Sequence, residues 1–214
     1  MPGFELIDQL ERNSVLEVFD KSNGVLFAHG FDVRRNNIFR VRDFEIKFAK
    51  ALGGQKAAAC TSGTSAQYIA MKCLGIKAGD EVITQSFTFI ATVEAILACG
   101  AKPVLVDIDE TYNMSPSSLE EAITDKTKLI VPVHMLGNPA EMDAINAIAK
   151  KHNIPVLEDA CEALGATYKG VSTGLLSDVG VFSLDFGKTI TTGEGGMIIS
   201  NNENLITTCM KFID

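Results

Sequence analysis

One stretch organises the interpretation of this chain: Phe182-Ser183-Leu184-Asp185-Phe186-Gly187-Lys188-Thr189-Ile190-Thr191-Thr192-Gly193-Glu194-Gly195-Gly196. An apolar run over residues 179–184 leads into it, and a second over 197–199 follows its glycine-rich turn. This pattern predicts two strands with Lys188 between them, its ammonium held over a packed interior. Burial disfavours a charged lysine, and a neutral lysine can attack a carbonyl and form a Schiff base. A solvated surface lysine is the alternative for this segment alone.

The composition indicates a globular domain that binds a small molecule. The 214 residues are 46% hydrophobic and 21% charged, which allows a sizeable core. The net charge of −8 disfavours nucleic acid and anionic membranes as partners, because both call for basic patches. The five cysteines contain no CxxC pair, so we expect neither a disulfide framework nor a metal site. We find no signal-peptide pattern and no apolar run of membrane-spanning length, and therefore expect a cytoplasmic protein.

The chain is predicted to divide into a helical segment over residues 1–54 and an α/β domain over 55–214. Helical spacing of apolar residues covers 5–20 and 41–52. Beyond residue 55, short apolar runs alternate with helical patterns, which is typical of a parallel sheet covered by helices on both faces. In such sheets ligands bind at the carboxyl ends of the strands. The strands are predicted at 56–60, 81–84, 103–107, 129–134 and 155–157, and the helices at 64–74, 89–99, 116–123 and 140–152.

Four arginines lie between the two N-terminal helical patterns or at the start of the second: Arg34, Arg35, Arg40 and Arg42. Together they are candidates for binding an anion. A solvated charged loop is the alternative, with at least equal weight.

Polar residues that suit one cofactor follow several of the predicted strands. Residues 61–66 open a helix, where small residues expose N–H groups that bind phosphate, although plain helix capping is the alternative. Phe89 can lie on a planar ring or pack in the core. Asp159, at the end of a buried strand, needs a partner, and a pyridinium nitrogen is one such partner. A phosphate cradle, an aromatic ring, a carboxylate and a lysine make the parts of a site for pyridoxal phosphate (PLP).

These stretches resemble the DegT/DnrJ/EryC1/StrS family of PLP-dependent sugar aminotransferases, which belong to fold type I. The matching segments follow the family's order over roughly residues 20–205: 62–66, 86–92, 133–143, 158–165 and the Lys188 segment. The resemblance implies a fold type I large domain with a mostly parallel seven-stranded sheet between helices. It also implies that Lys188 forms the Schiff base with PLP and later moves protons, and that Asp159 pairs with the pyridine nitrogen.

The resemblance assigns further contacts with the cofactor. By it, Phe89 is the stacking aromatic, Gly63, Thr64 and Ser183 bind the phosphate, and Glu162 lies on the side of the phenolic oxygen. Position 162 is often glutamine in this family, so Glu162 adds a second carboxylate near the ring.

The activity that the resemblance implies is transfer of an amino group from glutamate to a keto or aldehyde sugar for surface polysaccharides. Residues 1–6, 25–31 and 185–188 are similar to the branch that aminates C8 of 3-deoxy-octulosonate for lipopolysaccharide, whereas a nucleotide-linked ketosugar is the broader expectation. The run before Lys188 departs from the family's usual histidine or asparagine pattern, which bears on the substrate. Family dehydratases carry histidine in place of the lysine, so Lys188 favours transamination.

Three alternatives to this activity are a PLP-binding sugar dehydratase, a non-catalytic regulatory homologue and an NAD-dependent sugar enzyme. Retention of Lys188 and Asp159 argues against a non-catalytic protein. The NAD-dependent enzyme would need a GxGxxG turn after its first strand, and residues 61–66 supply none.

Apolar residues at helical spacing continue over residues 203–214 without a stop signal. Family members are longer and form homodimers in which the neighbouring subunit contacts the cofactor phosphate. We therefore expect this chain to be a fragment that contains the large PLP-binding domain and lacks the small C-terminal domain.

Overall fold

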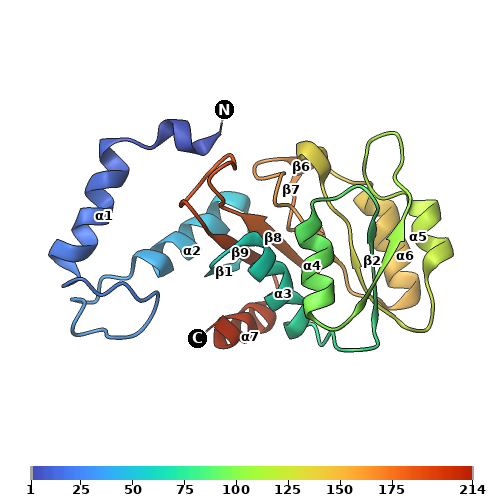
Figure 1. Cartoon of the computed structure of the whole chain (residues 1–214), viewed down its shortest axis with the longest axis horizontal. Helices are drawn as coiled ribbons and strands as arrows, with labels where there is room; N and C mark the ends of the chain where they lie inside the picture. The colour runs from blue at the N-terminus through green and yellow to red at the C-terminus, as the bar shows by residue number, and fades with distance from the viewer. Residues whose placement is uncertain (1, 214) are drawn as a thin grey trace.

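The computed structural model describes residues 2–213, and its centre is a seven-stranded sheet (Figure 1). Four strands lie in the order β1 (Lys56–Cys60), β9 (Gly196–Ser200), β8 (Val179–Ser183) and β5 (Leu157–Asp159), and three in the order β3 (Lys102–Val106), β2 (Glu81–Gln85) and β4 (Thr127–Val131). Parallel bridges from Ile130 to Val156 and from Val133 to Asp159 join β4 to β5. A short hairpin, β6 (Thr167–Tyr168) with β7 (Val171–Ser172), lies outside this sheet.

The predicted mostly parallel seven-stranded sheet is confirmed, with one antiparallel strand. Strands β5 and β8, β2 and β3, and β2 and β4 pair in parallel. Strand β9 runs antiparallel to both of its neighbours, β1 and β8. Consequently the carboxyl ends of the other six strands lie at one edge of the sheet, where ligands of such folds bind.

Helices cover both faces of the sheet. On one face α3 (Gly63–Cys73), α4 (Ile90–Ala98) and α7 (Glu203–Ile213) pack on a core that contains Val82, Leu157 and Ile198. On the other face α5 (Pro116–Ala122) and α6 (Met142–His152) pack near β2 and β4, while α2 (Arg40–Leu52) packs Phe48 and Ala49 near β8 and β9. The strands are therefore buried on both sides, as their continuous apolar runs predicted.

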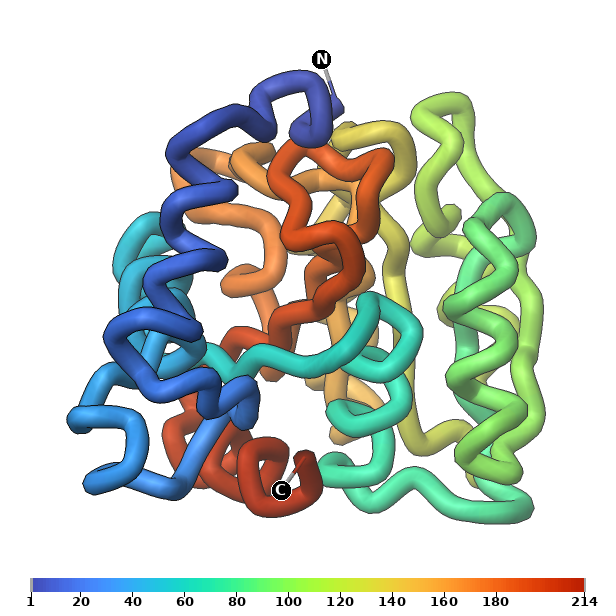
Figure 2. The backbone as a smooth tube through the Cα atoms, turned by 60° about the vertical axis from the view of Figure 1, so that its left-hand side comes forward, coloured from blue at the N-terminus to red at the C-terminus, as the bar shows by residue number. Residues whose placement is uncertain are grey.

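The N-terminal segment returns to the loop that carries Lys188. A 3₁₀ helix, η1 (Gly3–Leu6), precedes α1 (Gln9–Lys21), and no residue of α1 is buried. The N–H of Gly3 donates to the carbonyl of Lys188 at 2.8 Å, and the Phe4 ring stacks on Phe186 with centroids 4.4 Å apart. Figure 2 shows the N-terminal end of the chain lying against the orange-red loop that follows β8.

Candidate active site

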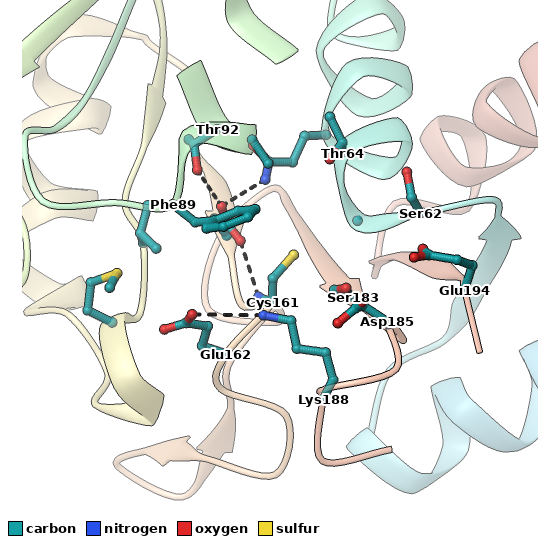
Figure 3. A pocket seen from close by; sticks show the side chains of 16 residues that line it. Ser62, Thr64, Phe89, Thr92, Cys161, Glu162, Ser183, Asp185, Lys188 and Glu194 are labelled. Atoms are coloured by element: carbon teal, nitrogen blue, oxygen red, sulfur yellow. Dashed lines mark hydrogen bonds and ion pairs between the residues drawn. The ribbon is translucent and has the colours of Figure 1, made fainter. Parts of the chain in front are cut away.

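All of the predicted site residues line one cavity of about 360 Å³ at the carboxyl edge of the sheet (Figure 3). They come from the start of α3, the N-cap of α4, the end of β5 and the turn after it, the end of β8 and the loop after it. The sequence therefore brings together, from distant segments, the following residues: Gly63, Thr64, Phe89, Asp159, Glu162, Ser183 and Lys188.

The start of α3 forms a cradle suited to an anion. Ser62 caps the helix by accepting a hydrogen bond from the Ser65 N–H at 3.0 Å. The first N–H groups of a helix have no partner within it, and the helix dipole adds positive potential there. A Cβ on Gly63 would lie 2.9 Å from the Cβ of Ser183, and one on Gly196 would lie 2.1 Å from the Ser62 carbonyl oxygen. Glycine at both positions lets the helix terminus approach β8 and β9, which leaves its N–H groups open to a phosphate.

Asp159 lies at the end of β5, and the residue is 4% exposed. Its Oδ2 accepts hydrogen bonds from Gln67 Nε2 and Thr92 Oγ1, both at 2.8 Å, and its Oδ1 accepts one from the Cys161 N–H at 3.2 Å. Its backbone N–H donates to the Pro132 carbonyl at 2.9 Å. A buried carboxylate so well supplied with donors is positioned to act as an acceptor for a further N–H.

Lys188 lies in the loop after β8 and reaches the cavity, but it is not deeply buried. Its side chain is 26% exposed, and its Nζ lies 3.8 Å from Glu162 Oε1 (Figure 3). The prediction of an ammonium held over a packed interior is therefore wrong. Lys188 lies on a loop at the cavity wall, where its side chain is partly solvated and the Glu162 carboxylate is a counter-charge.

Glu162 and Phe89 frame the same cavity. Glu162 Oε2 accepts a hydrogen bond from the Leu136 N–H at 3.1 Å, so this carboxylate joins the Lys188 amine to the segment after β4. Phe89 precedes α4 and is 66% exposed, which rules out the alternative that it packs in the core. Its ring points into the cavity in Figure 3. Its stacking role stays a prediction.

Several lining residues were not predicted. Gln67 lies one helical turn after Gly63 on the same face of α3, so its spacing was a usable signal. Thr92 lies within the run 86–92 that carried the resemblance, but only the fold brings it to Asp159. Cys161 is also close, but burial raises the pKa of its thiol well above the usual value, and the Asp159 carboxylate raises it further. The thiol is therefore protonated and no candidate nucleophile.

The arginine cluster does not line this cavity. Arg35 is 3% exposed and donates to the carbonyls of Ile38, Ala28 and Gly30. Arg40 pairs with Glu17 on α1, and the Arg42 guanidinium lies 4.0 Å from the centroid of the Phe39 ring. Arg35, Arg40 and Arg42 therefore have local structural contacts, and the cluster lies apart from the anion cradle of α3.

The residues of the cavity fit PLP. The N-terminus of α3 suits its phosphate, Asp159 suits its ring nitrogen, and Lys188 supplies an amine for its aldehyde. Gln67 Oε1 is a buried acceptor without a hydrogen-bond donor in the part of the chain that the structure describes, so the cavity wall has an acceptor that a bound molecule could use.

Within residues 2–213, no group of three or more His, Cys, Asp or Glu side chains is arranged to hold a metal ion. In the same range no helix is long and apolar enough to cross a membrane.

Comparisons with known proteins agree with this geometry. The chain is 48% identical over 164 residues to the GDP-perosamine synthase of Caulobacter vibrioides, a match that covers 76% of this chain and 44% of that protein. An aminotransferase structure from Psychrobacter cryohalolentis has 42% identity and a TM-score of 0.86, and the match covers 95% of this chain and 50% of that one. NtdA of Bacillus subtilis, solved with bound cofactor PMP, has 33% identity and a TM-score of 0.82 over 97% of this chain and 46% of its own.

The chain thus spans about half the length of the relatives that it matches. Residues 36–214 match the DegT/DnrJ/EryC1/StrS aminotransferase family, as the sequence motifs predicted. The family uses PLP, and its solved members are fold type I proteins. On these matches, the chain belongs to the DegT/DnrJ/EryC1/StrS aminotransferase family.

Proposed function

We propose that this protein binds PLP and transfers an amino group from glutamate to the keto group of a sugar. The observation that carries this proposal is the convergence of the Lys188 amine, the Asp159 carboxylate and the α3 N-terminus on one cavity. The family of the chain and the enzymatic names of its relatives support it. Lys188 also favours transamination over dehydration, since the resemblance places a histidine there in dehydratases.

Each of the converging groups has a task in this reaction. The α3 N-terminus and Ser183 would bind the phosphate, and Asp159 would accept a hydrogen bond from the ring nitrogen and orient the ring. When bound, PLP supplies an electron sink that stabilises the carbanion formed when the amino donor loses its α-proton. Lys188 Nζ would hold the cofactor's aldehyde carbon covalently at rest and move this proton once it is released. Glu162 keeps the amine near the cavity through their ion pair.

The acceptor that we propose is a nucleotide-linked ketosugar. The relative named GDP-perosamine synthase supports a nucleotide-linked substrate. The narrower alternative, an 8-oxo-3-deoxy-octulosonate, rests on the similarity of residues 1–6, 25–31 and 185–188 to that branch. The arginines that were candidates for its carboxylate lie outside the cavity lining, so this placement adds no support. We further propose a cytoplasmic homodimer acting in surface polysaccharide synthesis, as the family resemblance implies.

The covalent attachment site tests the cofactor role directly. After incubation with PLP and reduction with borohydride, peptide mapping is expected to find the pyridoxyl group on Lys188, and Lys188→Ala is expected to lose the near-visible absorbance of the bound cofactor. Lys169→Ala is the matched control, because Lys169 is exposed and pairs with Asp143 outside the cavity. A pyridoxyl group on Lys169, or on another lysine, would contradict the assignment of Lys188 as the residue that binds PLP covalently.

The acceptor is tested by competition. The protein is first converted with glutamate to its pyridoxamine form, and a GDP- or UDP-linked ketohexose and the 8-oxo-octulosonate are then offered together. Faster consumption of the nucleotide-linked sugar is expected. Preference for the octulosonate would overturn the proposed acceptor but leave the cofactor role intact.

A further inference from the structure

The side chains that contact Asp159 are all hydrogen-bond donors. Gln67 Nε2 and Thr92 Oγ1 both donate to Oδ2 at 2.8 Å, from α3 and α4 respectively. Thr88 Oγ1 lies 2.9 Å from Thr92 Oγ1. A hydroxyl has one hydrogen, and with that of Thr92 donated to Asp159, Thr92 Oγ1 is left as an acceptor. The Thr88 hydroxyl lies within reach of both Thr92 Oγ1 and the Phe89 carbonyl oxygen, at 3.3 Å, and can donate to either.

The two oxygens of Asp159 are not equivalent. Oδ2 already accepts two short hydrogen bonds from side chains, whereas the bond that Oδ1 accepts from the Cys161 N–H is longer, at 3.2 Å. A carboxylate oxygen can accept two hydrogen bonds, so Oδ1 has capacity left and Oδ2 has none. Oδ1 is therefore the oxygen available to a ring N–H.

The Gln67 amide is turned so that its Nε2 faces Asp159. In this orientation its buried Oε1 has no donor within residues 2–213. A buried acceptor without a partner costs free energy, so the orientation is maintained by the carboxylate. The amide thereby presents a donor to Asp159, as a carboxylate acceptor requires.

We propose that Gln67 and Thr92 are positioning residues that hold the Asp159 carboxylate in place and direct its Oδ1 at the ring nitrogen of the cofactor. This inference rests on the proposed function, since it assumes that PLP occupies the cavity. Both residues act through Asp159. Their loss is expected to weaken the hydrogen bond to the ring nitrogen and so reduce the fraction of bound cofactor whose nitrogen is protonated.

The test uses PLP labelled with ¹⁵N in the ring, whose chemical shift distinguishes a protonated from an unprotonated nitrogen. The variants are Thr92→Val and Gln67→Met, which remove the donors at similar volume, and Thr92→Ser, which retains the hydroxyl. Thr84→Val is the matched control, because Thr84 is also fully buried but donates to the Val131 carbonyl, away from the cavity. Circular dichroism and urea unfolding check that each variant folds.

We expect a protonated nitrogen in wild type, Thr92→Ser and Thr84→Val. In Thr92→Val and Gln67→Met we expect a shift toward the unprotonated value and affinity for PLP weaker by on the order of tenfold. Because each variant tests the network separately, one that misfolds leaves the other decisive. If a folded Thr92→Val or Gln67→Met has the same ¹⁵N chemical shift and the same affinity for PLP as wild type, the inference is overturned while the proposed function stands. A wild-type chain that takes up no PLP would overturn both.

Discussion

Glu158→Gln should destabilise the fold strongly, although it changes only one side-chain atom. Glu158 precedes Asp159 on β5 and points to the opposite face of the sheet, as alternation along a strand requires. It is fully buried. Its Oε1 accepts from the Leu176 N–H at 2.7 Å and Ser177 Oγ at 2.9 Å, and its Oε2 from the Gly174 N–H at 2.7 Å and His134 Nε2 at 3.0 Å.

The magnitude follows from counting donors. An amide accepts at one oxygen only. With its NH₂ group toward Gly174 and His134 it would face two donors, but toward Leu176 and Ser177 it would face one, because Ser177 Oγ can donate to the Val156 carbonyl at 3.2 Å and accept from the amide. A change of His134 tautomer does not help, because Nδ1 already accepts the Ala140 N–H at 3.1 Å and would then leave that group unpaired. In the better orientation one hydrogen bond to a charged group, that from the Leu176 N–H, is lost, which costs about 1.5–3 kcal/mol. We expect a fall of about 2–3 kcal/mol in the free energy of unfolding.

Urea unfolding followed by circular dichroism measures this loss by linear extrapolation. The matched control is Glu120→Gln, because Glu120 is exposed and pairs with the exposed Lys151, so its unfolding midpoint should stay close to wild type. A loss below about 1 kcal/mol for Glu158→Gln would show that its donors find other partners, and the count of unpaired groups would then be wrong.

Three further predictions concern the segments around the cavity. Gly3→Ala should loosen the loop of residues 184–195, because its Cβ would lie 2.8 Å from the Thr189 carbonyl oxygen. Limited proteolysis within this loop should then be faster than in wild type, and an unchanged rate would contradict the prediction. Burial raises the pKa of Glu45 although the neighbouring Ala59 N–H and His29 lower it, so the stability given by its protonated form is lost as pH rises through that pKa. The free energy of unfolding of Glu45→Gln should therefore match that of wild type at about pH 4 and exceed it at about pH 7. The same difference in this free energy between the two proteins at both pH values would refute the prediction. Asp159→Asn should fold, since the Gln67 amide can rotate to present Oε1, yet slow a single turnover with glutamate severely; a rate near wild type would exclude the proposed role.

Most strands could be located from the sequence because continuous apolar runs are a strong signal, but their ends could not. The predicted strand over 129–134 ends in the structure at Val131, and beyond Pro132, which has no N–H, pairing with β5 continues as an isolated bridge from Val133 to Asp159. The antiparallel direction of β9 was missed, although a signal existed. The connection from Ser183 to Gly196 carries no helical pattern, and parallel neighbours need a crossover of a dozen or more residues, usually a helix.

The candidate site was predictable in its residues but not in its environment. Glycine, hydroxyl and carboxylate positions after the strands identified the cradle and Asp159, because strand ends of a parallel sheet converge. The partners of those residues come from other elements, and one sequence gives no contact information. Thr92 reaches Asp159 from α4, and Gly3 reaches Lys188 from the opposite end of the chain. The predicted burial of Lys188 failed for the same reason, since exposure depends on how the loop after β8 is placed.

Glu158 and Asp159 are adjacent on β5, and because side chains alternate along a strand they point to opposite faces of the sheet. Glu158 fastens β5 to residues 174–177 on one face, and Asp159 enters the cavity on the other. Asp159 is thereby held by the sheet on one side and by α3 and α4 on the other. Lys188 instead lies on a loop, where its backbone is held by bonds to Asp185 and Gly3. In the proposed roles, an amine that first holds a cofactor and then carries a proton has to change position, whereas the carboxylate that orients the ring must not. The fold provides this difference, because the carboxylate is built on a strand and the amine on a loop.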